Sequence, residues 1–537
     1  MNWLGHLIIL PILLPFVTAA ALIPIDERRR ILKGSLSFGA TLVLLLTGTA
    51  LMIASATAQD NGSLVYQLGN WAAPYGIVLV VDRLSAMMIT LTTLMALCAQ
   101  MFSMARWHKA GPHFHTLFQF MLVGVNGAFL TGDLFNLFVF FEIMLAASYG
   151  LMLHGSGPVR VKAGLHYIAI NLAASSLFLI GVSLIYGASG TLNMADLALR
   201  IPDLSAENRM LLEAGAAVLG VAFLVKAGMW PLGFWLPQAY SAATPPVAAM
   251  FAILTKVGVY ILLRLSLLLF GSEAGTSAGF GQGVLLYGGL LTVTFGTIGV
   301  MASQAMGRLA SYYVLISSGS LMAAIGLGIT GVIPGTLFYL ISSTLGICAF
   351  FLLIDLVERA RDAGADVLAV TMEAYGDGDD DEAEKEVGAA VPGTMAVLGI
   401  CFVACTMLMA GLPPLSGFVA KFAILHGLFA SLGENAPITA AQWTFVALLI
   451  LSGLAALIAL NRVGIRTFWN SIEGTVPRVR LIEITPVLVL LAACGFLTLQ
   501  SGHALRYLQD TATALSQPLI YIDSVRDAVP VVSHGGS

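Results

Sequence analysis

The stretch FLVKAGMWPLGFWLPQAYSAATPP, residues 223–246, decides how this chain folds, because it is an apolar segment that contains a lysine and several prolines. A second stretch, CTMLMAGLPPLSGFVAKFAILHGL, residues 405–428, has the same character. Proline removes a backbone donor and clashes with the preceding turn, so both stretches predict helices that bend or open. The predicted helix breaks lie at Pro231, Pro237, Pro413 and Pro414.

Composition places the chain among membrane proteins. Of its 537 residues 58% are hydrophobic and only 10% are charged, with a mean hydropathy of +0.91. These values lie well outside the range of soluble domains. The sequence has no basic patch that would neutralise phosphates, so we expect no nucleic-acid partner. The fold class expected is an all-α polytopic membrane protein in a lipid bilayer.

About fourteen apolar segments are long enough to cross the bilayer as helices. With both termini outside, most Lys and Arg fall in cytoplasmic loops, as the positive-inside rule requires. The external segments then hold only Arg200, Arg209, Arg506 and Arg526. The predicted spans are 4–23, 36–57, 78–104, 114–131, 134–153, 164–187, 212–238, 246–270, 284–304, 309–330, 335–356, 393–431, 442–461 and 484–502.

The two broken stretches resemble each other. Ala227-Gly228 and Pro231-Leu232 match Ala410-Gly411 and Pro414-Leu415 at a constant offset of 183 residues. The second stretch lies five spans after the first, so it crosses the membrane in the opposite direction. Paired broken helices in oppositely oriented repeats indicate the working site of a transporter.

Four ionisable residues lie inside the apolar segments near the predicted midplane: Glu142, Lys226, Lys256 and Lys421. A charge in hydrocarbon costs several kcal/mol on insertion scales (roughly 2.5–3.5), so such residues are usually functional. Desolvation disfavours the charged form of both residue types, which allows proton exchange near neutral pH. Pairing Glu142 with Lys226 would restore both charges. The four side chains therefore predict a lateral row for proton translocation, although a lone intramembrane lysine can also snorkel or pair structurally.

Further polar residues are candidates for a proton relay. His426 follows Lys421 by five residues and is a candidate for passing protons outwards. Hydroxyl groups in the tenth and eleventh spans are candidates for holding bridging water: Ser317, Ser318, Ser320, Ser342, Ser343 and Thr344. Arg264 lies near a span end, and we expect a structural role for it.

An acidic insert, residues 358–391, interrupts the spans and is expected in the cytoplasm. Asp377, Asp379 and Asp381 suggest a calcium loop, but the sixth position lacks glycine and the twelfth, Gly388, is not glutamate. A solvated linker is the better interpretation. We expect no metal site in the chain.

Three segments together resemble a known family of membrane proteins. They are GDLFNLFVFFEIMLAASYGLM (132–152), VKAGMWPLGFWLPQAYSAATPPVAAMFAILTKVGVY (225–260) and AGLPPLSGFVAKF (410–422). They resemble the antiporter-like subunits shared by respiratory complex I, membrane hydrogenases and Mrp-type cation/proton antiporters, over roughly residues 78–465. Within that family the chain is most similar to the D-type subunits of Mrp antiporters, also called Pha.

The resemblance implies fourteen helices, with two inverted five-helix repeats and breaks in helices 7 and 12. It implies N-terminal helices over 1–113, a first repeat over 114–270, a second over 284–465 that contains the insert, and a last helix and tail over 466–537. By the same resemblance Glu142 and Lys226 are the proton-pumping pair, Lys256 is the connecting lysine and Lys421 is the terminal one. One departure is the eleventh span, LISSTLGICAF, which has serines where many relatives have histidines and a lysine.

Two functions agree with this resemblance. The first is the proton-translocating subunit of a multisubunit Na⁺(K⁺)/H⁺ antiporter driven by proton-motive force, a secondary-transporter subunit and not an enzyme. The alternative is a proton-pumping subunit in the membrane arm of an NADH dehydrogenase or hydrogenase. The chain has no flavin, iron–sulfur or quinone motif, so we expect no cofactor. The resemblance implies a bacterial inner membrane and membrane-subunit partners, including a larger homologous subunit.

Overall fold

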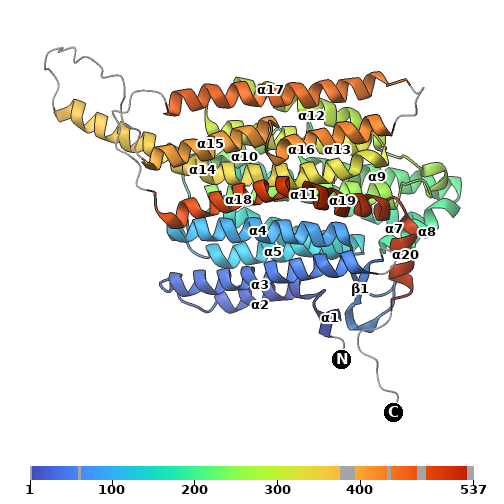
Figure 1. The fold of residues 1–537 in the computed structure, drawn as a ribbon. Helices are drawn as coiled ribbons and strands as arrows, with labels where there is room; N and C mark the ends of the chain where they lie inside the picture. The colour runs from blue at the N-terminus through green and yellow to red at the C-terminus, as the bar shows by residue number, and fades with distance from the viewer. Residues whose placement is uncertain (1–2, 59–61, 375–392, 432–436, 469–478, 529–537) are drawn as a thin grey trace.

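The computed structural model is a bundle of long helices that lie side by side (Figure 1). It describes residues 3–58, 62–374, 393–431, 437–468 and 479–528. Within these ranges twelve helices are long and apolar enough to cross a membrane, and three shorter apolar helices accompany them. The chain is therefore a multi-pass membrane protein, while the count of fourteen spans stays a prediction.

The long apolar helices are α3 (Arg30–Thr57), α4 (Arg83–Ala105), α6 (Leu134–Met152), α7 (Pro158–Ser189), α9 (Ala206–Ala227), α11 (Pro245–Leu268), α12 (Gln282–Ala302), α13 (Met306–Gly326), α14 (Ile333–Ala374), α15 (Gly393–Ala410), α17 (Ala440–Phe468) and α18 (Leu481–Leu499). The shorter apolar helices are α2 (Leu10–Leu22), α5 (Phe114–Leu130) and α16 (Ser416–Ala430). The remaining α-helices are α1 (Trp3–His6), α8 (Met194–Arg200), α10 (Leu236–Ala242), α19 (Ser501–Leu515) and α20 (Pro518–Arg526).

A small β-hairpin departs from the all-helical expectation. Strands β1 (Leu64–Gln67) and β2 (Val78–Val81) pair antiparallel, with Leu64 opposite Val81. The span predicted at 78–104 was therefore wrong at its start. Consecutive β-branched valines favour the strand, and Asp82 then begins α4 through a capping box with Ser85.

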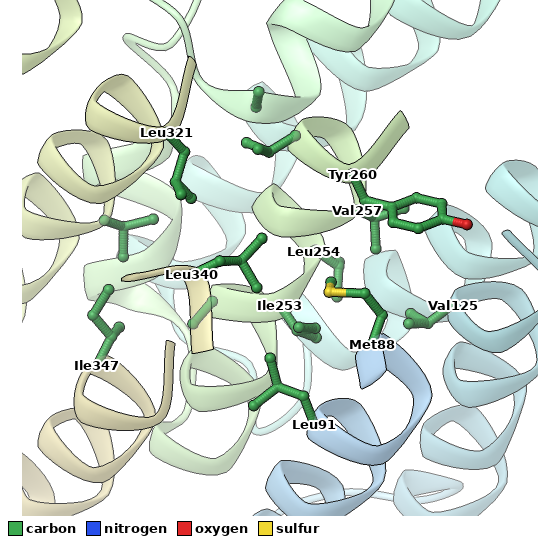
Figure 2. Close-up of a cluster of buried hydrophobic side chains, with 14 of the residues drawn as sticks. Met88, Leu91, Val125, Ile253, Leu254, Val257, Tyr260, Leu321, Leu340 and Ile347 are labelled. Atoms are coloured by element: carbon green, nitrogen blue, oxygen red, sulfur yellow. The ribbon is translucent and has the colours of Figure 1, made fainter. Parts of the chain in front are cut away.

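Helix α11 forms the centre of the bundle. Every residue in its most apolar window is buried. Figure 2 shows Ile253, Leu254 and Val257 of this helix among side chains from α4, α5, α13 and α14. Since the surrounding helices bury this window of α11, a polar group within it is held away from lipid.

The two predicted breaks have the same local structure. Helix α9 ends at Ala227 and α15 ends at Ala410. The next residues, Gly228 and Gly411, have φ values of 76° and 79°, a left-handed conformation that glycine adopts without steric cost. The peptide bonds before Pro231 and Pro414 are both cis. Pro237 does not break a helix but lies in the first turn of α10, where proline is well accommodated.

The C-terminal segment contains two further helices after the last predicted span. Helices α19 and α20 follow α18, and α20 packs on α8 and β1 at the end of the bundle where α1 lies (Figure 1). The Gln67 side chain donates to the backbone oxygen of Ala528 at 3.1 Å. The amphipathic helix α19 buries Leu508, Thr511 and Ala512, and it is too polar on its other face to be detected by hydropathy.

The predicted acidic insert is partly helical. Helix α14 continues past residue 358 to Ala374, so the start of the segment expected as a linker extends a membrane helix. Residues 375–392, which include the three aspartates of the calcium-loop alternative, lie outside the described residues.

Candidate functional site

Lys226 lies in the last turn of α9, directly before the first break. Its side chain is only 6% exposed. The amine donates a hydrogen bond of 2.8 Å to Oδ1 of Asn171 on α7. Helix α9 ends at Ala227, one residue after Lys226. The group that accepts the hydrogen bond from the buried amine is therefore a neutral amide on a neighbouring helix.

Asn171 is held in place by its own helix. Its Nδ2 group donates to the backbone oxygen of Tyr167, one turn earlier, at 2.7 Å. An amide has one accepting oxygen and one donating nitrogen, so these two contacts fix which atom faces Lys226. The side chain is 1% exposed, and its oxygen is therefore a preorganised acceptor.

Glu142 lies on α6, which Asp133 begins by accepting hydrogen bonds from the backbone of Phe135 and Asn136. Oε1 of Glu142 is buried and has no hydrogen-bond partner among the described residues. The expected direct pair with Lys226 is not formed, because Lys226 contacts Asn171 instead.

Aromatic side chains surround this pair of ionisable groups. Tyr167 packs against Tyr149 and Trp235 with ring centroids 5.6 and 5.3 Å apart, and its hydroxyl bonds to Ser148 at 2.7 Å. The Tyr149 hydroxyl and Trp235 Nε1 are buried and have no partner within the described ranges. Buried polar groups of this kind are commonly satisfied by internal water, so the site can be hydrated.

Lys256 lies in the middle of α11 and is fully buried. Its amine donates to the Ser318 hydroxyl on α13 at 3.1 Å. The contact joins the first predicted repeat to the second, because α13 lies in the second. A hydroxyl both donates and accepts, so Ser318 is suited to receive and pass on a proton through water.

Two more hydroxyl contacts continue from α13 into the second broken helix. Ser317 on α13 bonds to Ser343 on α14 at 2.9 Å. Ser342, also on α14, bonds to Ser416 at the start of α16 at 2.8 Å. Thr344 instead donates to Leu340 in its own helix. The serine pairs occupy the region where the sequence lacks a charged residue in the eleventh span.

Two further hydroxyls lie near this region without a partner. Ser320 Oγ and Tyr339 Oη are buried and make no hydrogen bond of normal geometry in the part of the chain that the structure describes, although the two hydroxyls lie near each other. Tyr313 uses its hydroxyl to bond the backbone oxygen of Met409, at 2.6 Å, close to the second break. The hydroxyls of these three residues are further buried polar groups on two of the helices that carry the serine pairs.

Lys421 lies on α16 and its side chain points back to the break. The amine donates to the backbone oxygens of Ala410 at 3.0 Å and Leu449 at 3.3 Å. The carbonyl of Ala410 is freed because the helix ends there. Lys421 is more accessible than the other two lysines, and His426 on the same helix is exposed beside Phe422. The structure therefore does not place His426 among the buried groups.

The ion pairs of the described residues involve other charged groups, and none includes Glu142, Lys226, Lys256 or Lys421. Arg264 pairs with Asp82 where α11 meets the start of α4, which confirms its expected structural role. Burial opposes ionisation of the Asp82 carboxyl, but the Arg264 guanidinium and hydrogen bonds with Ser85 hold the pKa of Asp82 below its usual range.

Two residues of this site were missed in the sequence. Asn171 is a single amide in the apolar segment 164–187, and Ser416 lies two residues after Pro414 at the second break. A buried amide in a membrane helix is a polar-site signal that could have identified Asn171. Ser416 gave no such signal, because serine is common at helix starts.

Comparison with known proteins places this arrangement in a family. The family model described as NADH:quinone oxidoreductase/Mrp antiporter, transmembrane, matches residues 131–450. The chain is 68% identical over 531 residues to a Rhizobium meliloti (strain 1021) protein named as the D-type subunit of a probable K⁺/H⁺ antiporter, covering 98% of each chain. It is 35% identical over 531 residues to the D-type subunit of the Na⁺/H⁺ antiporter of Alkalihalophilus pseudofirmus, covering 97% of this chain and 99% of the relative.

A solved structure shows the same fold. A chain in the structure of the Mrp complex from Dietzia sp. DQ12-45-1b superposes with a TM-score of 0.81 at 26% sequence identity. The match covers 98% of this chain and 100% of that one. The two chains therefore share this fold over nearly their whole length.

Proposed function

The chain belongs to the NADH:quinone oxidoreductase/Mrp antiporter transmembrane family, and from that premise we propose that it is the proton-translocating subunit of a multisubunit Na⁺(K⁺)/H⁺ antiporter. Proton-motive force drives the exchange. The two relatives described above support the antiporter over the alternative, a subunit of a redox complex, because both are named as subunits of cation/proton antiporters.

One observation carries the proposal: Lys226 and Lys256 are buried in the bundle, and among the described residues their hydrogen bonds go to neutral groups and neither forms an ion pair. A buried charge without a counter-ion is strongly disfavoured. A purely structural lysine would be paired, as Arg264 is with Asp82. Lysines kept without a counter-ion are suited to bind and release protons.

The proposed path runs laterally through the bundle. Glu142 and Lys226 form its first part, and Lys256 connects the two repeats. Water held by the serines of α13 and α14 then carries the proton towards Lys421. The contacts that support this order are Lys256 with Ser318, Ser317 with Ser343, and Ser342 with Ser416.

Membership in the family supports a proposal for the assembly and for its place in the cell. We propose other membrane subunits as partners, among them a larger homologous subunit, in a bacterial inner membrane with both termini outside. The proposed division remains 1–113, 114–270, 284–465 and 466–537, with repeats related by inversion. The matching ends of α9 and α15 and their glycines support it. The names of the relatives include both Na⁺ and K⁺, so exchange should be measured with each of the two cations.

The test is cation-dependent proton exchange in everted vesicles from an antiporter-deficient bacterium that expresses the whole assembly. We expect the native complex to exchange H⁺ for Na⁺ or K⁺, and Lys226→Ala to abolish exchange while the complex still assembles. Lys162→Ala is the matched control, because Lys162 is exposed in the first turns of α7. An assembled Lys226→Ala complex with undiminished exchange would overturn the proposal.

Identification of the co-purifying subunits tests the alternative. Hydrophobic subunits that include a larger homologue are expected for the antiporter. Flavin- or iron–sulfur-containing partners would instead make the chain a pump module of a redox enzyme.

A further inference from the structure

Lys226 and the two acceptors beside it come from three different helices. The amine on α9 bonds to Asn171 on α7, while Glu142 on α6 has a buried oxygen without a partner among the described residues. Lys226 therefore hydrogen-bonds a neutral acceptor on α7 and forms no ion pair with the charged side chain on α6.

The two acceptors differ in how they treat a proton. A carboxylate stabilises the ammonium form of lysine as an ion pair. An amide oxygen accepts a hydrogen bond but supplies no counter-charge, and in a buried site an uncompensated ammonium is disfavoured. The ammonium thus holds its proton best at Glu142 and releases it most easily at Asn171.

We infer that Asn171 is a positioning residue of the proton path: it provides the neutral position from which Lys226 releases its proton, and Glu142 provides the position in which Lys226 is loaded. This inference rests on the proposed function. The amine has three rotatable donors on a flexible stem, so rotation of the side chain can change its acceptor. The proton released by the ammonium passes to water on the way to Lys256, and the neutral amine remains.

The geometry of Asn171 fits this role better than a packing role. Its oxygen is directed to the amine because its nitrogen is occupied by the Tyr167 backbone oxygen at 2.7 Å. Tyr167 is itself held by Ser148 at 2.7 Å, so the acceptor is fixed relative to α6 as well. A side chain that only fills space between helices would not need its amide oxygen oriented towards the Lys226 amine.

Other ionisable side chains on the elements around α9 must be counted in a pH experiment. They are Glu142 and Tyr149 on α6, Tyr167 on α7, Tyr240 on α10 and Lys256 on α11. All are native groups and are unchanged in the variants below. A change in pH dependence between native and variant complexes therefore reports the substituted position.

The decisive variant is Asn171→Asp, which keeps the shape of the side chain and adds a counter-charge at the releasing position. We expect the pH at which exchange is half-maximal to move upwards by at least about one unit, because the ammonium now keeps its proton there. Asn126→Asp on α5 is the matched control. Asn126 is also fully buried, but its amide donates to the Pro11 backbone oxygen on α2, and the native pH profile is expected.

If the Asn171→Asp complex does not assemble, a second variant tests whether exchange needs the Asn171 amide. Asn171→Leu removes the neutral acceptor without adding charge, and exchange is expected to fall about tenfold, as for a lost hydrogen bond to a charged group. An unshifted pH profile in assembled Asn171→Asp, or native exchange rates in Asn171→Leu, would overturn the inference while the native complex still exchanges. Absence of exchange in the native complex would reject the proposed function instead.

Discussion

Ser342 of α14 and Ser416 of α16 share a hydrogen bond of 2.8 Å at the second helix break. Both side chains are buried. Ser416 is the first residue of α16 and Lys421 is on the same helix, with its amine turned back to Ala410. The serine pair therefore joins the long helix α14 to the break that holds the terminal lysine.

Ser416→Ala is expected to reduce exchange about tenfold, because it removes one hydroxyl from the proposed path and leaves Ser342 without this partner. Stability should fall by only about 1 kcal/mol. The measurement is the exchange rate in vesicles together with the thermal midpoint of the purified complex. Thr336→Val is the matched control on α14, since Thr336 donates only to its own helix at Val332. Equal rates in the native and Ser416→Ala complexes would exclude this hydroxyl from the path.

Lys256→Met should abolish exchange without loss of stability. Methionine fills a similar volume and removes an amine whose only hydrogen bond in the described structure is to Ser318. Replacing a buried charge by an apolar side chain is often neutral or stabilising. The thermal midpoint is therefore expected to stay or rise while exchange is lost. A large fall in the midpoint would show that Lys256 serves the packing of α11.

Gly411→Ala is expected to impair the second break more than an ordinary glycine substitution would. Its φ of 79° costs a side chain about 1–2 kcal/mol, and an added Cβ would approach Cδ of Lys421 to 2.8 Å. The Lys421 amine must then move from the Ala410 oxygen.

Gly495→Ala is the control for this prediction, because no atom of the described residues lies within 4 Å of the added Cβ. Both the midpoint and the exchange rate should fall in Gly411→Ala but remain native in Gly495→Ala. Native exchange by Gly411→Ala would show that the position of Lys421 tolerates this shift.

The Asp82–Arg264 pair predicts how stability depends on pH. Because the pKa of Asp82 is lowered in the folded protein, the pair contributes fully above the unfolded value of 3.8 and loses its contribution as pH falls through the folded value. Asp82→Asn leaves Arg264 buried without its partner, which costs roughly 3–5 kcal/mol. The measurement is the thermal midpoint of the native and Asp82→Asn complexes between pH 3 and 7. We expect the variant's midpoint to lie far below the native one at pH 7 and closer to it at pH 3. If the two midpoints differed by the same amount at every pH, ionisation of Asp82 would not be the source of the stabilisation.

Several features could be predicted from the sequence because they depend on local chemistry. Apolar length identified the membrane helices, and the prolines and glycines at Gly228 and Gly411 identified the breaks. The high cost of charge in lipid singled out the buried lysines. The hairpin at Val78 and the helices α19 and α20 were missed, because short strands and amphipathic helices have too weak a hydropathy signal.

The sequence by itself determined the fold class, the two breaks and the burial of Lys226 and Lys256. Only the tertiary structure decided the partners of those residues: Asn171 and not Glu142 for Lys226, Ser318 for Lys256, and backbone oxygens for Lys421. The physical reason is that burial follows from local composition, whereas a hydrogen bond of about 3 Å requires helices distant in sequence to pack in one register. That register depends on contacts along the whole length of α7, α9, α11 and α13, which no local pattern encodes.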